Sequence, residues 1–307
     1  MASGAEPRVA VRIHRPCEAL IGYITFFYFV DIGGPLTDFL YPEWGNVRFS
    51  IAGQWDVLMD GFESPPPRTA ALFGPTDRPG RIVTTGGRCI GFGMTPIGWH
   101  RLIGGDASEM ANRIAPLEHR LGFDGEALLD ALVAEPDETA SVATIERLLL
   151  ARLATRPPVS PAVRAVDRAL RMRPAEVVEF AELAELTERT LYRLCLKTFG
   201  FAPKRLMRLQ RFLDTLGQVR SAIGGQVRGS IDSYFDQAHF YRDFRDFMGM
   251  TPRAYFGAPR RLMAAAAMEQ MRAGVSLSFR LPPQPGDDEP ERRAEPPPAP
   301  LRLAAAR

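Results

Sequence analysis

The chain has 307 residues, of which 46% are hydrophobic and 24% charged, and its formal net charge is +2. This length allows two domains with separate cores, and the composition is typical of a globular protein. The N-terminus lacks the basic-then-apolar order of a secretory signal, and the longest apolar run, residues 20–30, is too short to span a bilayer. The three cysteines are too far apart to indicate a disulfide framework, so we expect a cytoplasmic protein.

Residues 8–105 contain short β-branched and aromatic runs separated by Gly and Pro, a pattern that predicts strands. Many short strands favour a sandwich or barrel. The expected strands are 21–30, 47–51, 70–73, 81–85 and 89–94. Aromatic residues expected to line the barrel interior are Phe26, Phe27, Tyr28, Phe29, Tyr41, Trp44, Phe49 and Trp55. They form either a filled core or the wall of a pocket for a small apolar or aromatic effector.

Helices are expected to follow the strands, at residues 107–114, 125–134 and 139–154. The last of these has an apolar stripe that would pack on its own domain or form a dimer surface. Residues 1–155 are therefore expected to form an N-terminal β-rich domain for sensing or self-association.

Residues 156–161 are rich in Pro and predict a linker, in which Ser160 and Pro161 also start the next helix. We expect residues 162–260 to form an all-α domain, with helices at 162–173, 176–186 and 203–220 beside two further helices described below. The helical pattern weakens after residue 256. Residues 280–307 contain 8 prolines in 28 positions and are expected to be disordered.

One pattern occurs twice in the C-terminal half, at a constant offset of 49 residues. Each copy predicts a helix with apolar positions three and four apart, which ends at Gly and is followed by Pro. Thr187 and Asp236 are the expected N-caps of the two helices. The repeated landmarks are Arg193 and Arg242, Gly200 and Gly249, and Pro203 and Pro252.

The sides of these two helices that face away from the apolar stripe carry Arg, Gln, His, Tyr and Lys. Arg and Gln near a helix start can bind guanine and adenine edges in a major groove. Residues 187–261 contain 14 Lys and Arg against 6 Asp and Glu, although the whole chain is only at +2. The positive charge is thus concentrated where phosphates would be met.

The segment Thr187–Arg193, the segment Asp236–Phe244 and the two Gly-x-x-Pro turns resemble the DNA-binding domain of the AraC/XylS transcription regulators. The match covers residues 160–257. Proteins of that family carry two helix-turn-helix units joined by a linker helix. By position, the resemblance implies base contacts from Arg189, Tyr192, Arg193, Gln237, His239, Tyr241 and Arg242. Phosphate contacts are expected from Thr187, Lys197, Lys204, Arg205, Arg208 and Arg245.

The chain departs from that family at two turns. Glu185 stands where the family usually has Gly before the first recognition helix. Before the second helix, Arg228-Gly229 and Ser233-Tyr234 stand where the family has Ile-Ala and Gly-Phe or Gly-Tyr. The family spacing is restored if Val227 and Ile231 are the apolar pair and the turn has gained one residue. The segments 91–98 and 114–118 resemble, more loosely, the end of the N-terminal sensing domain of one subgroup.

The sequence offers little support for an enzyme. A metal-dependent enzyme needs converging His or carboxylate ligands, and only three histidines lie outside the DNA-binding half. No Gly-rich phosphate loop and no nucleophile elbow is recognisable. Cys17 is either a structural thiol or a redox sensor. We therefore expect no catalytic residue, no metal and no cofactor.

The sequence predicts an α+β protein that acts as a sequence-specific DNA-binding transcription regulator of the AraC type. Double-stranded DNA is the expected partner, and no membrane is expected. A small-molecule effector, RNA polymerase and a second copy of the chain are further candidate partners. The expected location is the cytoplasm, with the protein on the bacterial nucleoid when it is bound to DNA. The alternatives are a small-molecule-binding protein with a decayed DNA-binding domain and, less favoured, an enzyme built on the β-rich domain.

Overall fold

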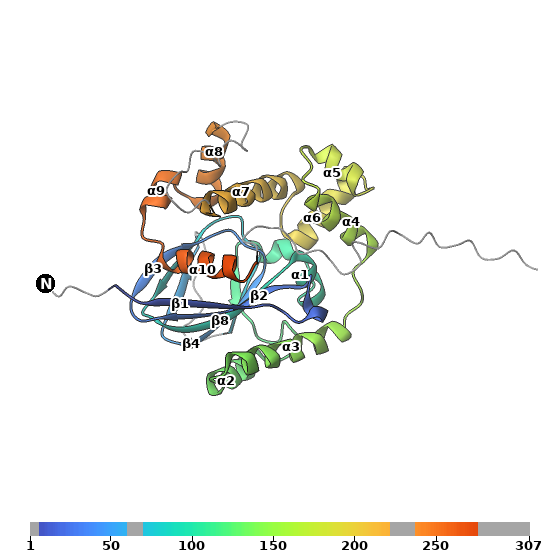
Figure 1. The fold of residues 1–307 in the computed structure, drawn as a ribbon. Coiled ribbons are helices and arrows are strands. Elements are labelled where there is room, and N and C mark those ends of the chain that lie inside the picture. The colour runs from blue at the N-terminus through green and yellow to red at the C-terminus, as the bar shows by residue number, and fades with distance from the viewer. Residues whose placement is uncertain (1–5, 60–69, 222–236, 276–307) are drawn as a thin grey trace, which may run out of the picture.

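The computed structural model describes residues 6–59, 70–221 and 237–275. Strands form its N-terminal part and helices most of its C-terminal part, so the expected α+β class is confirmed (Figure 1). The expected N-cap Asp236, the irregular turn at 228–234 and the tail 280–307 lie outside the described residues. Within the described ranges, every helix is too short or too polar to cross a bilayer.

The described strands form two antiparallel sheets, with orders β1-β2-β8-β4-β6-β9 and β3-β7-β5. Neither sheet closes on itself, so the expected sandwich or barrel is an open arrangement of two sheets. The strands are β1 (Val9–His14), β2 (Ile24–Ile32), β3 (Leu36–Leu40), β4 (Asn46–Ala52), β5 (Trp55–Leu58), β6 (Ala70–Phe73), β7 (Gly80–Thr84), β8 (Gly87–Met94) and β9 (Ile114–Pro116).

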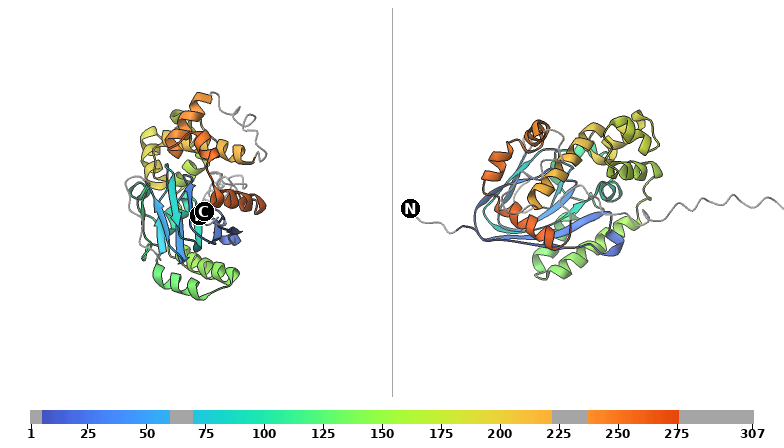
Figure 2. Two further views of the ribbon diagram at one scale, coloured as in Figure 1. Left: turned by 90° about the vertical axis from the view of Figure 1, so that its left-hand side faces the viewer. Right: turned by 45° about the horizontal axis from the view of Figure 1, so that its top comes forward.

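Helices cover both sides of these sheets (Figure 2). Helices α4 to α9 lie on one side, while α2 and α3 lie on the other. They are α1 (Pro96–Leu102), α2 (Gly125–Ala134), α3 (Glu138–Ala154), α4 (Pro161–Arg171), α5 (Val177–Leu183), α6 (Glu188–Phe199), α7 (Pro203–Ser221), α8 (Gln237–Met248), α9 (Pro252–Gly257) and α10 (Arg261–Arg272), with 3₁₀ turns η1 (Glu18–Leu20) and η2 (Ala107–Met110).

Strand β2 separates two apolar regions because successive side chains of a strand point to opposite faces. Phe27 and Phe29 are fully buried in a core shared with α3. Tyr28 and Val30 contact a second cluster between the sheets. The expectation of one aromatic-lined interior is therefore wrong, because alternation divides these rings between two faces.

Two aromatic residues of the β-rich part pack outside both of these regions. Tyr41 and Trp44 belong to a buried cluster formed mainly by the C-terminal helices. The ring centroids of Trp44 and Phe199 are 5.8 Å apart, and those of Tyr41 and Tyr255 are 6.2 Å apart. These contacts hold the helical part against the sheets.

The helix expected at residues 107–114 is wrong. Asp106 caps only the short turn η2, and Asn112 adopts a left-handed backbone with φ 57° that ends it. Ile114 then begins strand β9, where it pairs with Phe73 of β6. Pairing with a distant strand overrides the local helical preference.

A second correction concerns the region after residue 256, where the helical pattern weakens in the sequence. Helix α10 follows α9 there and runs along β1 (Figure 1). Its N-terminal part is fixed to the sheet, because the Met263 amide donates to the buried carboxylate of Asp38 at 3.0 Å.

Candidate nucleic-acid interface

Helix α6 is the first of the two expected recognition helices. Thr187 caps it by accepting a hydrogen bond from the Thr190 amide at 3.3 Å, and Gly200 ends it in a left-handed conformation with φ 84°. Its buried face carries Leu191, Cys195 and Phe199. Both ends of the helix are thus where the sequence predicts them.

The opposite face of α6 is exposed to solvent and mainly basic. Tyr192 is 51% exposed, and Arg189, Arg193 and Lys197 are exposed beside it. These side chains recur at three- and four-residue steps, so they share one side of the helix. The structure therefore brings together the side chains of α6 that the sequence assigns to DNA.

Helix α5 precedes α6 through a tight turn centred on Glu185. The Glu185 amide donates to Glu182 O at 2.9 Å, and the Leu186 amide donates to Ala181 O at 2.9 Å. This pair of bonds is the Schellman pattern, in which the residue past the helix end is left-handed. Glu185 has φ 54°. The chain keeps the backbone that Gly would adopt at this turn, although its residue is Glu.

Helix α8 is the second expected recognition helix. Phe240, Phe244 and Phe247 are fully buried and pack around Phe212 of α7. His239, Tyr241, Arg242 and Arg245 are exposed on its other side, and Asp246 beside them is exposed as well. The side chain of Gln237 lies outside the described set.

Helix α7 connects the two units, with α6 near one end and α8 near the other (Figure 1). Two of its arginines, which the sequence assigns to phosphate contacts, form ion pairs within the protein. Arg205 pairs with Asp77 of the β-rich part at 2.6 Å and with Asp246 of α8. Arg208 pairs with Asp243 at 2.5 Å. Their phosphate contacts stay a prediction, and Lys204, the third expected contact on this helix, is exposed.

Those ion pairs also fix the charge of the aspartate between them. Burial alone would raise the pKa of Asp246, but hydrogen bonds and charges from Arg205 and Arg208 hold it below its ordinary value. Arg205 also lies 4.1 Å from the centroid of the Phe247 ring. This cluster orients α8 relative to α7 and to the β-rich part.

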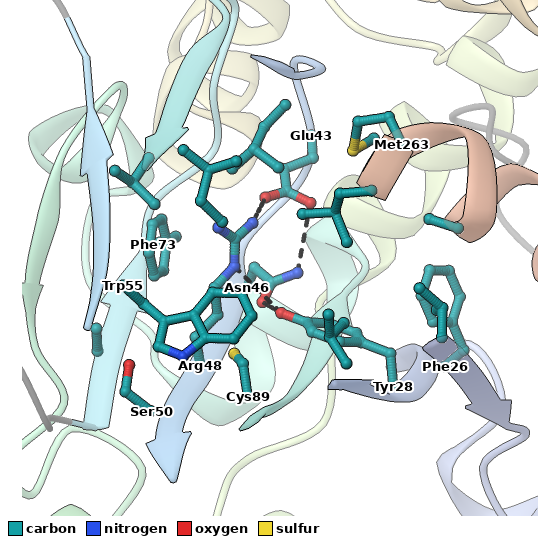
Figure 3. A pocket seen from close by; sticks show the side chains of 18 of the residues that line it. Phe26, Tyr28, Glu43, Asn46, Arg48, Ser50, Trp55, Phe73, Cys89 and Met263 are labelled. Carbon is teal, nitrogen blue, oxygen red and sulfur yellow. Dashed lines mark hydrogen bonds and ion pairs between the residues drawn. The ribbon is translucent and has the colours of Figure 1, made fainter. Parts of the chain in front are cut away.

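A separate cavity of about 130 Å³ lies between the sheets and α10 (Figure 3). A closed ring of polar contacts occupies one wall. Arg48 pairs with Glu43 and donates to the Tyr28 hydroxyl at 3.1 Å. The Tyr28 hydroxyl donates to Asn46 at 2.7 Å, and Asn46 donates to Glu43 at 3.4 Å.

Burial raises the pKa values of all three cysteines, Cys17, Cys89 and Cys195. Burial raises the pKa of the Cys89 thiol, beside the cavity, to about 12, and burial also raises that of Cys17. Both thiols are therefore largely protonated at neutral pH, which favours the structural interpretation of Cys17 over the redox one. Within the described ranges, no cluster of three or more His, Cys, Asp or Glu side chains is arranged to hold a metal ion.

The sequence interpretation missed the part that α10 takes in this cavity. The cavity is lined by Leu262, Met263, Ala266 and Gln270. The last three follow Leu262 by one, four and eight positions, which places all four on one side of a helix. That spacing is the signal that could have predicted the contact. It is weak because the helix around it is rich in alanine.

Comparison with known proteins gives only distant structural likenesses. No protein-family model matches, and a search of the curated proteins finds no match. The 1.65 Å structure of ToxT from Vibrio cholerae is 8% identical, with 82% of this chain and 98% of that one covered and a TM-score of 0.45. The unsaturated fatty acid-bound form of ToxT is also 8% identical, with 83% of this chain and 96% of that one covered and a TM-score of 0.42. The AraC-like transcriptional activator CuxR is 16% identical, with 68% of this chain and 87% of that one covered and a TM-score of 0.26. The function proposed below therefore rests on this chain's own residues.

Proposed function

We propose that this chain is a sequence-specific DNA-binding transcription regulator of the AraC type. One observation carries the proposal: two helices of the same sequence pattern, α6 and α8, each followed by a left-handed Gly, lie near the two ends of α7 with basic and aromatic side chains exposed. A solvated helix face explains one such surface. It does not explain two that recur at a constant offset with the same landmarks.

The chemistry of these surfaces suits duplex DNA. Arg193 and Arg242 are equivalent in the two copies, and a guanidinium can donate two hydrogen bonds to one guanine. Thr187, Lys197 and Arg245 lie near the same faces and would bind phosphate oxygens, which position the protein without reading sequence. Each phosphate contact displaces counterions, so binding would weaken steeply with salt.

Arg205 and Arg208 take a second role in this proposal. Because both are paired with aspartates, a phosphate must compete with Asp77, Asp243 and Asp246 for their guanidinium groups. We assign them first to the orientation of α8 relative to α7. Their contact with DNA would follow from the release of those aspartates.

The proposal is tested by selecting duplex DNA from a random pool with the full-length protein, at about 50 mM and 200 mM salt. Enrichment of one motif with two blocks about one helical turn apart is expected if both units read bases. A single short block would mean that only one unit does. No enrichment at either salt would overturn the proposal in favour of a ligand-binding protein with a decayed DNA-binding domain.

Variants assign the contacts. Arg193→Ala and Arg242→Ala should each relax preference at one base pair by about 1–3 kcal/mol, in different blocks of the motif. Arg147→Ala is the matched control, because it removes the same charge from an exposed position on α3, on the opposite side of the sheets (Figure 2). Equal selectivity in all three variants would contradict the assignment.

A further inference from the structure

We infer that the cavity between the sheets and α10 binds an uncharged, mainly apolar molecule of one or two rings that carries a hydrogen-bond donor. The role of this molecule as an effector of DNA binding rests on the proposed function, whereas its binding in the cavity does not. Four features of the cavity support the inference: its size, its rings, its balanced charge and one buried amide oxygen.

The size and the rings define the body of the ligand. The volume of about 130 Å³ is close to that of an engineered cavity of about 150 Å³ that binds benzene. Phe26, Tyr28, Trp55 and Phe73 line it from both sheets (Figure 3). Aromatic side chains favour flat rings in offset or edge-to-face contact.

The charge of the ligand follows from the closed ring of polar contacts. Arg48 and Glu43 are the charged side chains among the lining residues, and they neutralise each other. The Arg48 guanidinium also stacks on the Phe73 ring, 4.1 Å from its centroid. An anionic ligand would have to displace Glu43 from Arg48 and would then lie beside that carboxylate. An uncharged ligand leaves the pair intact.

The hydrogen-bond donor is required by Gln270 of α10. Its side chain is more than nine-tenths buried, at 8% exposure, and it lines the cavity. Its Oε1 atom accepts no hydrogen bond from any group in the described part of the chain. A buried acceptor without a donor is unfavourable, so a ligand N–H or O–H directed at this oxygen would satisfy it.

Helix α10 forms one wall of the cavity, and polar bonds at both of its ends fix it to the rest of the protein. The Met263 amide donates to Asp38 at one end, and Arg15 donates to the Ala273 carbonyl at 2.9 Å at the other. The helix directly follows α9, so a ligand in the cavity contacts the same segment that leaves the second DNA-binding unit.

The test uses the full-length protein without DNA and three probes of similar shape: indole, benzothiophene and indole-5-carboxylate. Binding is measured by calorimetry or by ligand-observed NMR. Indole should bind at least about fivefold more tightly than benzothiophene, which lacks the N–H donor, and at least about tenfold more tightly than the carboxylate. Equal binding of indole and benzothiophene, tighter binding of the carboxylate, or no binding of any probe at millimolar concentration would overturn the inference.

Two variants locate the site. Gln270→Leu should bring the ratio of indole to benzothiophene affinity to about one while benzothiophene still binds, an outcome that a merely misfolded variant would not give. Ala266→Phe fills the cavity and should abolish binding of both probes. Met268→Leu is the control on the exposed side of α10, at 48% exposure, and should change neither affinity. Unchanged indole preference in Gln270→Leu would contradict the role of Gln270. Because DNA is absent, these results stand apart from the DNA selection.

Discussion

Replacement of Glu185 by Gly should stabilise the protein, although Glu185 is exposed. The residue occupies the left-handed position of the turn between α5 and α6, with φ 54°. Its carboxylate forms no ion pair with any described residue. The side chain therefore contributes little that the substitution would remove, whereas its Cβ makes the backbone conformation costly.

The magnitude follows from two opposing terms. A left-handed backbone costs a residue with a Cβ about 1–2 kcal/mol. Gly relieves that cost but gains about 0.5–1 kcal/mol of conformational freedom in the unfolded chain. The net expectation is an increase of about 0.5–1 kcal/mol in the free energy of unfolding. Glu185→Ala keeps the Cβ, so it should remain within about 0.5 kcal/mol of the parent.

Urea unfolding followed by far-ultraviolet circular dichroism measures the difference. With a slope of about 2–3 kcal/mol/M, Glu185→Gly should raise the midpoint by roughly 0.2–0.5 M urea relative to Glu185→Ala. If the Gly variant is no more stable than the Ala variant, the left-handed cost assigned to this turn is wrong. The DNA selection should be the same for both variants, because the turn already has the conformation that the first unit needs.

Three further predictions concern other contacts. Gly200→Ala should destabilise the protein by about 1–2 kcal/mol in the same urea assay, because φ is +84° and an added Cβ would lie 2.7 Å from Pro75 Cγ; an unchanged midpoint would refute this. Asp77→Asn should strengthen DNA binding uniformly across sequences in salt titrations, because it removes one of the two aspartate charges that pair with Arg205, and a sequence-selective change would count against phosphate contact. Burial alone would raise the pKa of Glu138, but hydrogen-bonded and charged neighbours lower it below 4.5; the stability this adds is therefore present above pH 4.5 and lost as pH falls below it. Glu138→Gln should make urea stability less dependent on pH in that range, and an unchanged pH dependence would contradict the assignment.

The helices that carry the proposed DNA surface were predictable because their signals are local. The capping residue Thr187, the terminating Gly200 and the apolar spacing all lie within one segment, and the structure places α6 where they indicate. The same holds for α3 and α7, whose apolar stripes extend over several turns. Local patterns of this length are the strongest signals in a single sequence.

The cavity could not be predicted in the same way because its parts are distant in the chain. Gln270 meets Tyr28 and Trp55 only after α10 returns to the sheets. The ion pair of Arg48 with Glu43 gives no sequence signal that separates it from a pair on the protein surface. The division of the aromatic residues between two faces of β2 depends on register, which a run of consecutive aromatics does not specify.

The position of α10 gives the ligand and DNA a common element. The helical part is held to the sheets by Trp44 at the first unit and by Tyr41 at the second, so the two units cannot move freely relative to the cavity. If the ligand and DNA both bind most tightly when α10 lies against the sheets, the ligand must raise the affinity of the protein for DNA, and DNA must raise its affinity for the ligand by the same factor. Indole affinity measured with and without the selected duplex gives that factor directly. A factor of one would mean that the cavity and the DNA surface act independently.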